Sequence, residues 1–130
     1  MRYTVAIFGE AERGSFQTAF FCQNLEQLER NLGSPPENSL GLDLAIQSLL
    51  YDRNLIFFRV KEEGFSVQDY LYGLYLLETQ HLFANVRAIG MPGVGDLQIL
   101  DASETICDIY KSMLITTEAD LYDYLTDKNV

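Results

Sequence analysis

Three carboxylates in this chain have the type and position needed to bind a hard cation. Glu10 and Glu12 follow the first apolar run, and Asp96 follows the glycine-rich segment at residues 90–95. Carboxylate oxygens are ligands that Mg²⁺ prefers. If the preceding runs are parallel strands, their carboxyl ends share one edge of a sheet, where open α/β sheets bind ligands. The three residues are candidate metal ligands, and the alternative interpretation, which we favour, is a solvated acidic rim.

Phosphate chemistry is poorly supported by the neighbouring residues. A receiver-like phosphorylation site needs an aspartate at the end of the central strand, but that run ends Arg59-Val60-Lys61. The segment Gly90–Gly95 lacks both the Lys-Ser/Thr pair of a P-loop and the glycine spacing of a dinucleotide site. We interpret it as a strand-to-helix turn that needs glycine for its backbone angles.

Histidine and cysteine give no further catalytic pattern. His81 is the only histidine and is expected at a helix end, on the surface. Cys22 and Cys107 lie in apolar contexts with no basic neighbour, so we interpret them as buried free thiols rather than a disulfide or a reactive pair. The sequence therefore predicts no catalytic residue and no cofactor.

Tyrosines are concentrated in the second half of the chain. Four of them lie off the apolar faces of their expected helices, namely Tyr72, Tyr75, Tyr122 and Tyr124. An exposed tyrosine adds apolar area and a hydrogen-bonding tip, which favours protein interfaces. The alternative is a place at the margin of the core. We take these four as the candidate interaction residues.

The overall charge narrows the classes of partner. The 130 residues include 9 Lys+Arg and 19 Asp+Glu, for a formal net charge of -10. This charge disfavours nucleic acid, whose phosphates need basic side chains, and it disfavours an anionic membrane surface. No apolar run reaches the length of about 18 residues expected of a transmembrane helix, and no signal-peptide pattern is present. We expect a cytoplasmic protein that binds neither nucleic acid nor a membrane.

Apolar periodicity and turn residues define the elements that must position these side chains. The run Asn54-Leu-Ile-Phe-Phe-Arg-Val60 is almost continuously apolar, which suits a central strand buried on both faces. The expected strands cover residues 3–8, 18–22, 54–60, 86–90 and 112–116. The expected helices begin near caps at Asn24, Ser66 and Thr117, or cover about residues 39–51 and 97–110.

This alternation predicts an α/β fold. We expect a single three-layer domain over residues 1–130, with a mostly parallel five-stranded sheet and helices on both faces. The short second strand is the one expected to lie at an edge or to pair antiparallel.

Several short motifs follow one another in an order seen in a known family. They are the turn Ala11-Glu-Arg-Gly14, the capped helix Asn24 to Gly33, the helix Leu42 to Leu50, the strand Asn54 to Val60, and the segment Leu74 to Glu78 with Val86 to Gly90, Pro92-Gly93 and Asp96. This order resembles the tail sheath proteins of contractile phage tails and related injection machines. Sheath subunits of that family build a contracting cylinder and are linked through terminal arms. The resemblance implies a sheath-like core domain, and we expect the terminal arms to be absent.

Two hypotheses for function follow. The first is a non-enzymatic assembly or protein-interaction domain, resembling the core of a tail sheath subunit, that binds a protein partner or self-associates. The alternative is a small-ligand or Mg²⁺-dependent enzyme or sensor that uses the acidic loops at Glu10, Glu12 and Asp96.

Overall fold

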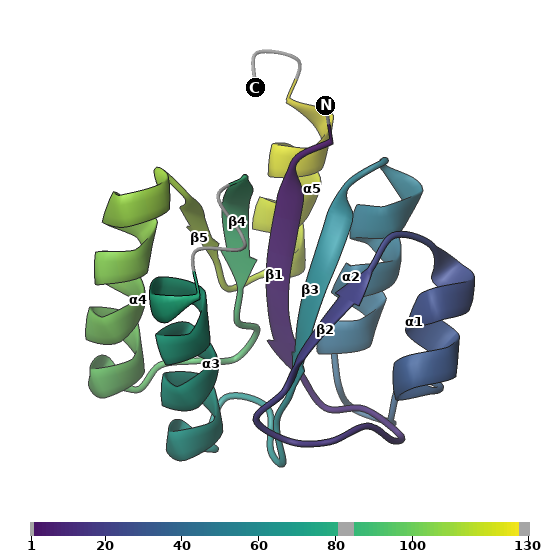
Figure 1. Ribbon diagram of the computed structural model, residues 1–130, viewed down its shortest axis with the longest axis horizontal. Coiled ribbons are helices and arrows are strands. Elements are labelled where there is room, and N and C mark those ends of the chain that lie inside the picture. Colours follow the sequence, from purple (N-terminus) through teal and green to yellow (C-terminus); the bar gives the residue numbers. More distant parts are fainter. Residues whose placement is uncertain (1, 81–84, 128–130) are drawn as a thin grey trace.

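The strand in the middle of the sheet is β1 (Thr4–Gly9), and every one of its residues is buried. The structure is a computed structural model that describes residues 2–80 and 85–127. Its five strands lie in the order β2-β3-β1-β4-β5 (Figure 1). The other strands are β2 (Ala19–Cys22), β3 (Asn54–Arg59), β4 (Val86–Gly90) and β5 (Met113–Ile115).

The pairing is parallel except at one edge. β1 pairs in parallel with β3 and β4, and β4 pairs in parallel with β5. β2 is an edge strand and pairs antiparallel with β3. The prediction for the second strand is therefore confirmed. The apolar run at 54–60 is an interior strand, as expected, but the middle position belongs to β1.

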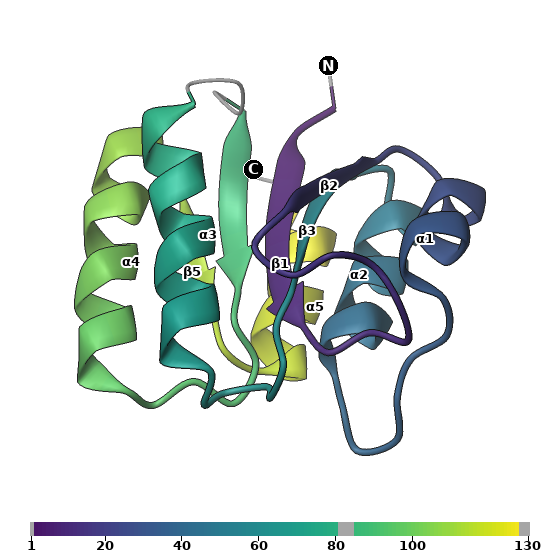
Figure 2. The same cartoon turned by 60° about the horizontal axis from the view of Figure 1, so that its bottom comes forward.

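Helices cover both faces of the sheet. One face carries α1 (Leu25–Leu32), α2 (Gly41–Leu50) and α5 (Glu118–Thr126), and the other carries α3 (Val67–Thr79) and α4 (Leu97–Tyr110) (Figures 1 and 2). Successive residues of β1 alternate between the two layers of core: Val5 and Ile7 pack on the first side, Ala6 and Phe8 on the second. The predicted three-layer α/β domain is confirmed.

Polar side chains start several helices as predicted. The Asn24 side chain accepts a hydrogen bond from the Gln27 backbone N–H at 2.9 Å, and the Thr117 hydroxyl accepts one from the Asp120 N–H at 3.1 Å. Ser66 differs, because its hydroxyl accepts from the backbone N–H of Glu62 instead of capping α3. The Asn24 and Thr117 side chains thus supply acceptors to N–H groups in the first turns of α1 and α5, which have no partner within the helix.

The core beneath α3 is built on stacked aromatic rings. Phe8 stacks on Phe58, with ring centroids 4.6 Å apart, and on Tyr70, at 5.3 Å. Gly73 of α3 faces this stack, and a Cβ built there would lie 2.4 Å from Cε2 of Phe8. The glycine is thus needed for the close approach of α3 to the sheet.

The four parallel strands all begin at one end of the sheet and finish at the other, and these two ends are different from the outer strands β2 and β5. We call the end where β1, β3, β4 and β5 begin the amino edge, and the end where they finish the carboxyl edge. The chain enters β1 at the amino edge, and α5 also ends there (Figure 1). None of the helices within residues 2–80 and 85–127 is long and apolar enough to span a membrane.

Candidate functional site

The side chain of Glu63 fills the carboxyl edge, where open α/β sheets bind their ligands. Its Oε1 accepts hydrogen bonds from the backbone N–H groups of Glu10 at 3.0 Å and Gly41 at 2.8 Å. Its Oε2 accepts from the N–H of Leu40 at 2.9 Å. Leu40 and Gly41 begin α2, so the carboxylate lies at the positive end of that helix. Helix N-termini of this kind bind anions, and here the chain supplies its own.

Glycines allow backbone segments to approach one another closely at the same edge. A Cβ built on Gly9, at the end of β1, would lie 2.6 Å from the Cα of Gly41. A Cβ built on Gly64, in the loop after β3, would lie 2.6 Å from the carbonyl oxygen of Gly93, in the loop after β4. The end of β1 thus meets the start of α2, and the loop after β3 meets the loop after β4, at backbone distance. Both contacts lie at the edge brought forward in Figure 2. Beside the Gly64–Gly93 contact lies a hollow of about 350 Å³, lined by Gly64, Phe65, Val67, Gly93, Gly95 and Asp96.

The three candidate metal ligands each accept a hydrogen bond from the backbone. Oε2 of Glu10 accepts from the Glu63 N–H at 2.9 Å, Oε1 of Glu12 from Ser34 at 3.0 Å, and Oδ1 of Asp96 from Ile99 at 3.1 Å. Among the described residues there is no group of three His, Cys, Asp or Glu side chains that could hold a metal ion. The structure therefore does not bring Glu10, Glu12 and Asp96 together, and it gives each a role in fixing a loop or a helix start.

The turn at residues 11–14 closes on the end of α1. The Arg13 guanidinium donates to the carbonyl oxygens of Glu29 at 2.7 Å and Arg30 at 3.3 Å. A cation at these carbonyls stabilises the negative end of the helix. The charged residues of this turn thus anchor it to α1.

The thiols lie in surroundings that keep them protonated. Both cysteines are free; Cys22 is buried, whereas Cys107, which was expected to be buried, is half-buried. Burial raises the pKa of Cys22, and burial together with the nearby Asp108 carboxylate raises the pKa of Cys107. Because the thiolate is the nucleophile, both are weak nucleophiles at neutral pH. His81 lies outside the described residues.

Two of the candidate tyrosines form an exposed pair on α3. Tyr72 is 41% exposed and Tyr75 is 58% exposed, and their ring centroids are 6.2 Å apart. They lie on the side of α3 opposite its buried residues Tyr70, Leu74 and Leu77. We call these two residues the α3 tyrosine pair. Tyr122, on α5 across the sheet, is 54% exposed.

The expectation that Tyr124 is an exposed interaction residue is wrong. Its side chain is only 3% exposed, and it belongs to the core with Leu121 and Leu125. The physical reason is its spacing: Tyr124 follows Leu121 by three residues, which places both on one side of a helix. That spacing was a signal in the sequence that could have identified its burial.

Comparisons with known proteins were made by family models, by curated sequences and by solved structures. None of the three finds a match. The resemblance to tail sheath proteins consequently stays a prediction. What bears on function is the geometry of the chain itself.

Sequence reasoning missed the residue that organises the carboxyl edge. The partners of Glu63 lie far from it in the sequence, 22 or 23 residues away at Gly41 and Leu40 and 53 residues away at Glu10. No local pattern marks such a residue. By contrast, the charged Arg87 stands within the otherwise apolar strand Val86–Gly90. A charge inside an apolar strand can be recognised in the sequence alone as a candidate functional residue.

Proposed function

We propose that this domain acts by binding a protein partner or a second copy of itself. The observation that carries the proposal is the α3 tyrosine pair, whose two rings lie in contact on the outer side of α3. Paired exposed tyrosines combine apolar area with hydroxyl groups and lose little side-chain entropy on binding, which makes them effective at interfaces.

The arrangement of the carboxyl edge supports the same proposal. The helix N-terminus that would receive an anionic ligand already receives Glu63. The carboxylates of the alternative hypothesis, an Mg²⁺-dependent or small-ligand site, are bonded to backbone N–H groups. The resemblance to sheath cores favours self-association as the form that the binding takes.

Light scattering coupled to size exclusion, across a series of protein and salt concentrations, tests the proposal. We expect the wild-type chain to form a defined oligomer, or to co-elute with a partner protein from its own host. The double variant Tyr72→Ser/Tyr75→Ser should lose that species while remaining folded. Tyr122→Ser is the matched control, because it removes an equally exposed tyrosine from the opposite face of the sheet. A wild type that stays monomeric and binds no host protein would contradict the proposal.

A further inference from the structure

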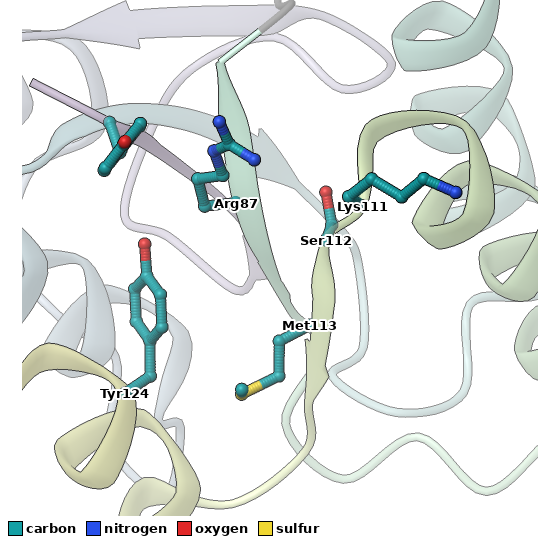
Figure 3. A pocket seen from close by; sticks show the side chains of 6 residues that line it. Arg87, Lys111, Ser112, Met113 and Tyr124 are labelled. Carbon is teal, nitrogen blue, oxygen red and sulfur yellow. The ribbon is translucent and has the colours of Figure 1, made fainter. Parts of the chain in front are cut away.

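A hollow at the amino edge is lined by polar groups that lack partners. Its volume is about 580 Å³, within the range of about 300–1,000 Å³ found for small-molecule pockets. It opens between the starts of β4 and β5 and the end of α5 (Figure 3). Glu63 lies at the opposite, carboxyl edge, after β3. The residues that line the hollow are Tyr3, Arg87, Lys111, Ser112, Met113 and Tyr124.

Two of these residues present buried donors without an acceptor. Neither the Tyr124 hydroxyl nor Nε of Arg87 has a hydrogen-bond partner among the described residues, although both atoms are buried. The Tyr124 side chain as a whole is at least nine-tenths buried. Its hydroxyl points from α5 toward the Arg87 side of the hollow (Figure 3). A buried donor without an acceptor is costly, and such groups usually have a bound partner.

Unpartnered polar atoms are concentrated at this edge. Five buried side-chain nitrogen or oxygen atoms lack a partner in the part of the chain that the structure describes. Four of them lie at the amino edge, on Arg53, Asn54, Arg87 and Tyr124, and the fifth is on Arg59. Three of these four atoms are donors, and Oδ1 of Asn54 is an acceptor. Arg87 and Tyr124 line the hollow, where a ligand can supply the acceptors that their donors lack.

Basic residues gather at this edge, although the chain as a whole is strongly acidic. Arg2, Arg53, Arg87 and Lys111 lie there, four of the nine basic residues. The Arg87 guanidinium has no hydrogen bond or ion pair within residues 2–80 and 85–127, and it lies over the Tyr3 ring, 4.7 Å from its centroid. Stacking on an aromatic ring holds the guanidinium in place and leaves its N–H groups free.

The remaining wall residues limit where a ligand can lie. The Ser112 hydroxyl donates to the carbonyl of Val86 at 2.6 Å, so its proton is already used. The Lys111 ammonium points away from Arg87 and Tyr124, at the rim (Figure 3). A second hollow shares Met113 and Tyr124 with the first and is lined by three aspartates, Asp120, Asp123 and Asp127. Those carboxylates repel anions, which confines an anionic group to the Arg87 end.

We propose that this hollow binds the oxyanion of a small organic ligand, a carboxylate or a phosphate monoester, between the Arg87 guanidinium and the Tyr124 hydroxyl. Guanidinium groups bind both kinds of oxyanion through paired N–H donors. The tyrosine O–H adds a third donor, and the exposed thioether of Met113 offers an apolar surface to the body of the ligand. This site is separate from the α3 tyrosine pair and does not depend on it.

Calorimetric titration and thermal shift of the full chain test the proposal, in a phosphate-free buffer at constant ionic strength. The probes are phenyl phosphate, inorganic phosphate and benzoate, with benzamide as the uncharged control. We expect binding of phenyl phosphate or benzoate, with a raised melting temperature because the ligand binds the folded state. Benzamide should not bind. Comparison of phenyl phosphate with benzoate distinguishes a phosphate ligand from a carboxylate ligand.

Two substitutions assign the binding to the hollow. Arg87→Gln and Tyr124→Phe should each weaken binding by at least about tenfold, since each removes a donor to the oxyanion. Arg30→Gln is the charge-matched control, because Arg30 is exposed on α1 and pairs with Glu26 at 3.1 Å. Should Arg87→Gln fail to fold, Tyr124→Phe decides alone. The proposal is overturned if the wild type binds neither oxyanion at millimolar concentration, if Tyr124→Phe binds as tightly as the wild type, or if Arg30→Gln weakens binding equally.

Discussion

Glu10 and Glu63 each bind the other's backbone through their side chains. The Glu10 N–H donates to Oε1 of Glu63 at 3.0 Å, and the Glu63 N–H donates to Oε2 of Glu10 at 2.9 Å. The two residues follow β1 and β3, neighbouring strands that pair in parallel. This reciprocal pair therefore locks together the two loops at the edge where ligands bind in related architectures. Carboxylates can serve in catalysis or metal binding, but those of Glu10 and Glu63 hold the backbone of the two loops in place.

Substitution of Glu63 should be far more costly than substitution of its neighbour. Glu63→Ala leaves the N–H groups of Glu10, Leu40 and Gly41 without their acceptor. We expect a loss of about 2–3 kcal/mol in the free energy of unfolding, measured by urea denaturation at pH 7. Glu62→Ala is the control, because the Glu62 side chain is exposed and the hydrogen bonds of this residue are made by its backbone N–H and carbonyl groups, which alanine keeps. Equal losses in the two variants would show that the Glu63 carboxylate has no such role.

Removal of the Glu63 carboxylate should also create a site for a free anion. The N–H groups of Leu40 and Gly41 at the start of α2 would then be available, and helix N-termini bind sulfate and phosphate. We expect added sulfate to raise the melting temperature of Glu63→Ala more than that of the wild type. Sulfate also stabilises proteins generally, so the Glu62→Ala variant in the same buffers measures that background. An identical response in all three proteins would argue that α2 offers no anion site.

The order of elements was predictable because it depends on local signals. Caps such as Asn24 and Thr117 and the apolar run at Asn54 act within a few residues of themselves. The roles of Glu10 and Glu63 were not predictable in this way, because they arise where loops far apart in sequence meet. Tyr124 lies between these cases: its spacing from Leu121 was local, and its unpartnered hydroxyl was visible only in three dimensions.

Gly73 in α3 should be intolerant of even a methyl group. Alanine favours a helix by about 1 kcal/mol over glycine, yet a Cβ here would lie 2.4 Å from the Phe8 ring. That ring is held between Phe58 and Tyr70 and has little room to move. We expect Gly73→Ala to lose about 1–3 kcal/mol of stability in thermal denaturation. Gln68→Ala, at an exposed position of the same helix, should be neutral or slightly stabilising. A stabilised Gly73→Ala variant would contradict this packing.

Tyr70 should make the protein sensitive to alkaline pH. Burial raises the pKa of its hydroxyl above the usual 10.0, the Gly64 N–H lowers it, and the Glu63, Glu10 and Asp69 carboxylates raise it. The folded chain thus keeps the proton at a pH where the unfolded chain releases it. The contribution to stability is complete below about pH 10 and falls as the pH rises further, by at most about 1.4 kcal/mol per pH unit. Urea denaturation between pH 8 and about 11 should show a flatter decline for Tyr70→Phe than for the wild type.

At neutral pH the same Tyr→Phe change should have opposite consequences at two buried positions. The Tyr70 hydroxyl accepts a hydrogen bond from the Gly64 N–H at 2.7 Å, so Tyr70→Phe leaves a buried donor unpaired. We expect a loss of about 1–3 kcal/mol. The Tyr124 hydroxyl is buried and has no partner among the described residues, so its removal relieves a desolvated polar group. In ligand-free buffer, Tyr124→Phe should therefore match or exceed the wild type in thermal stability. A marked loss of stability in Tyr124→Phe would mean that its hydroxyl is already bonded in the free protein, which would count against an open site beside Arg87.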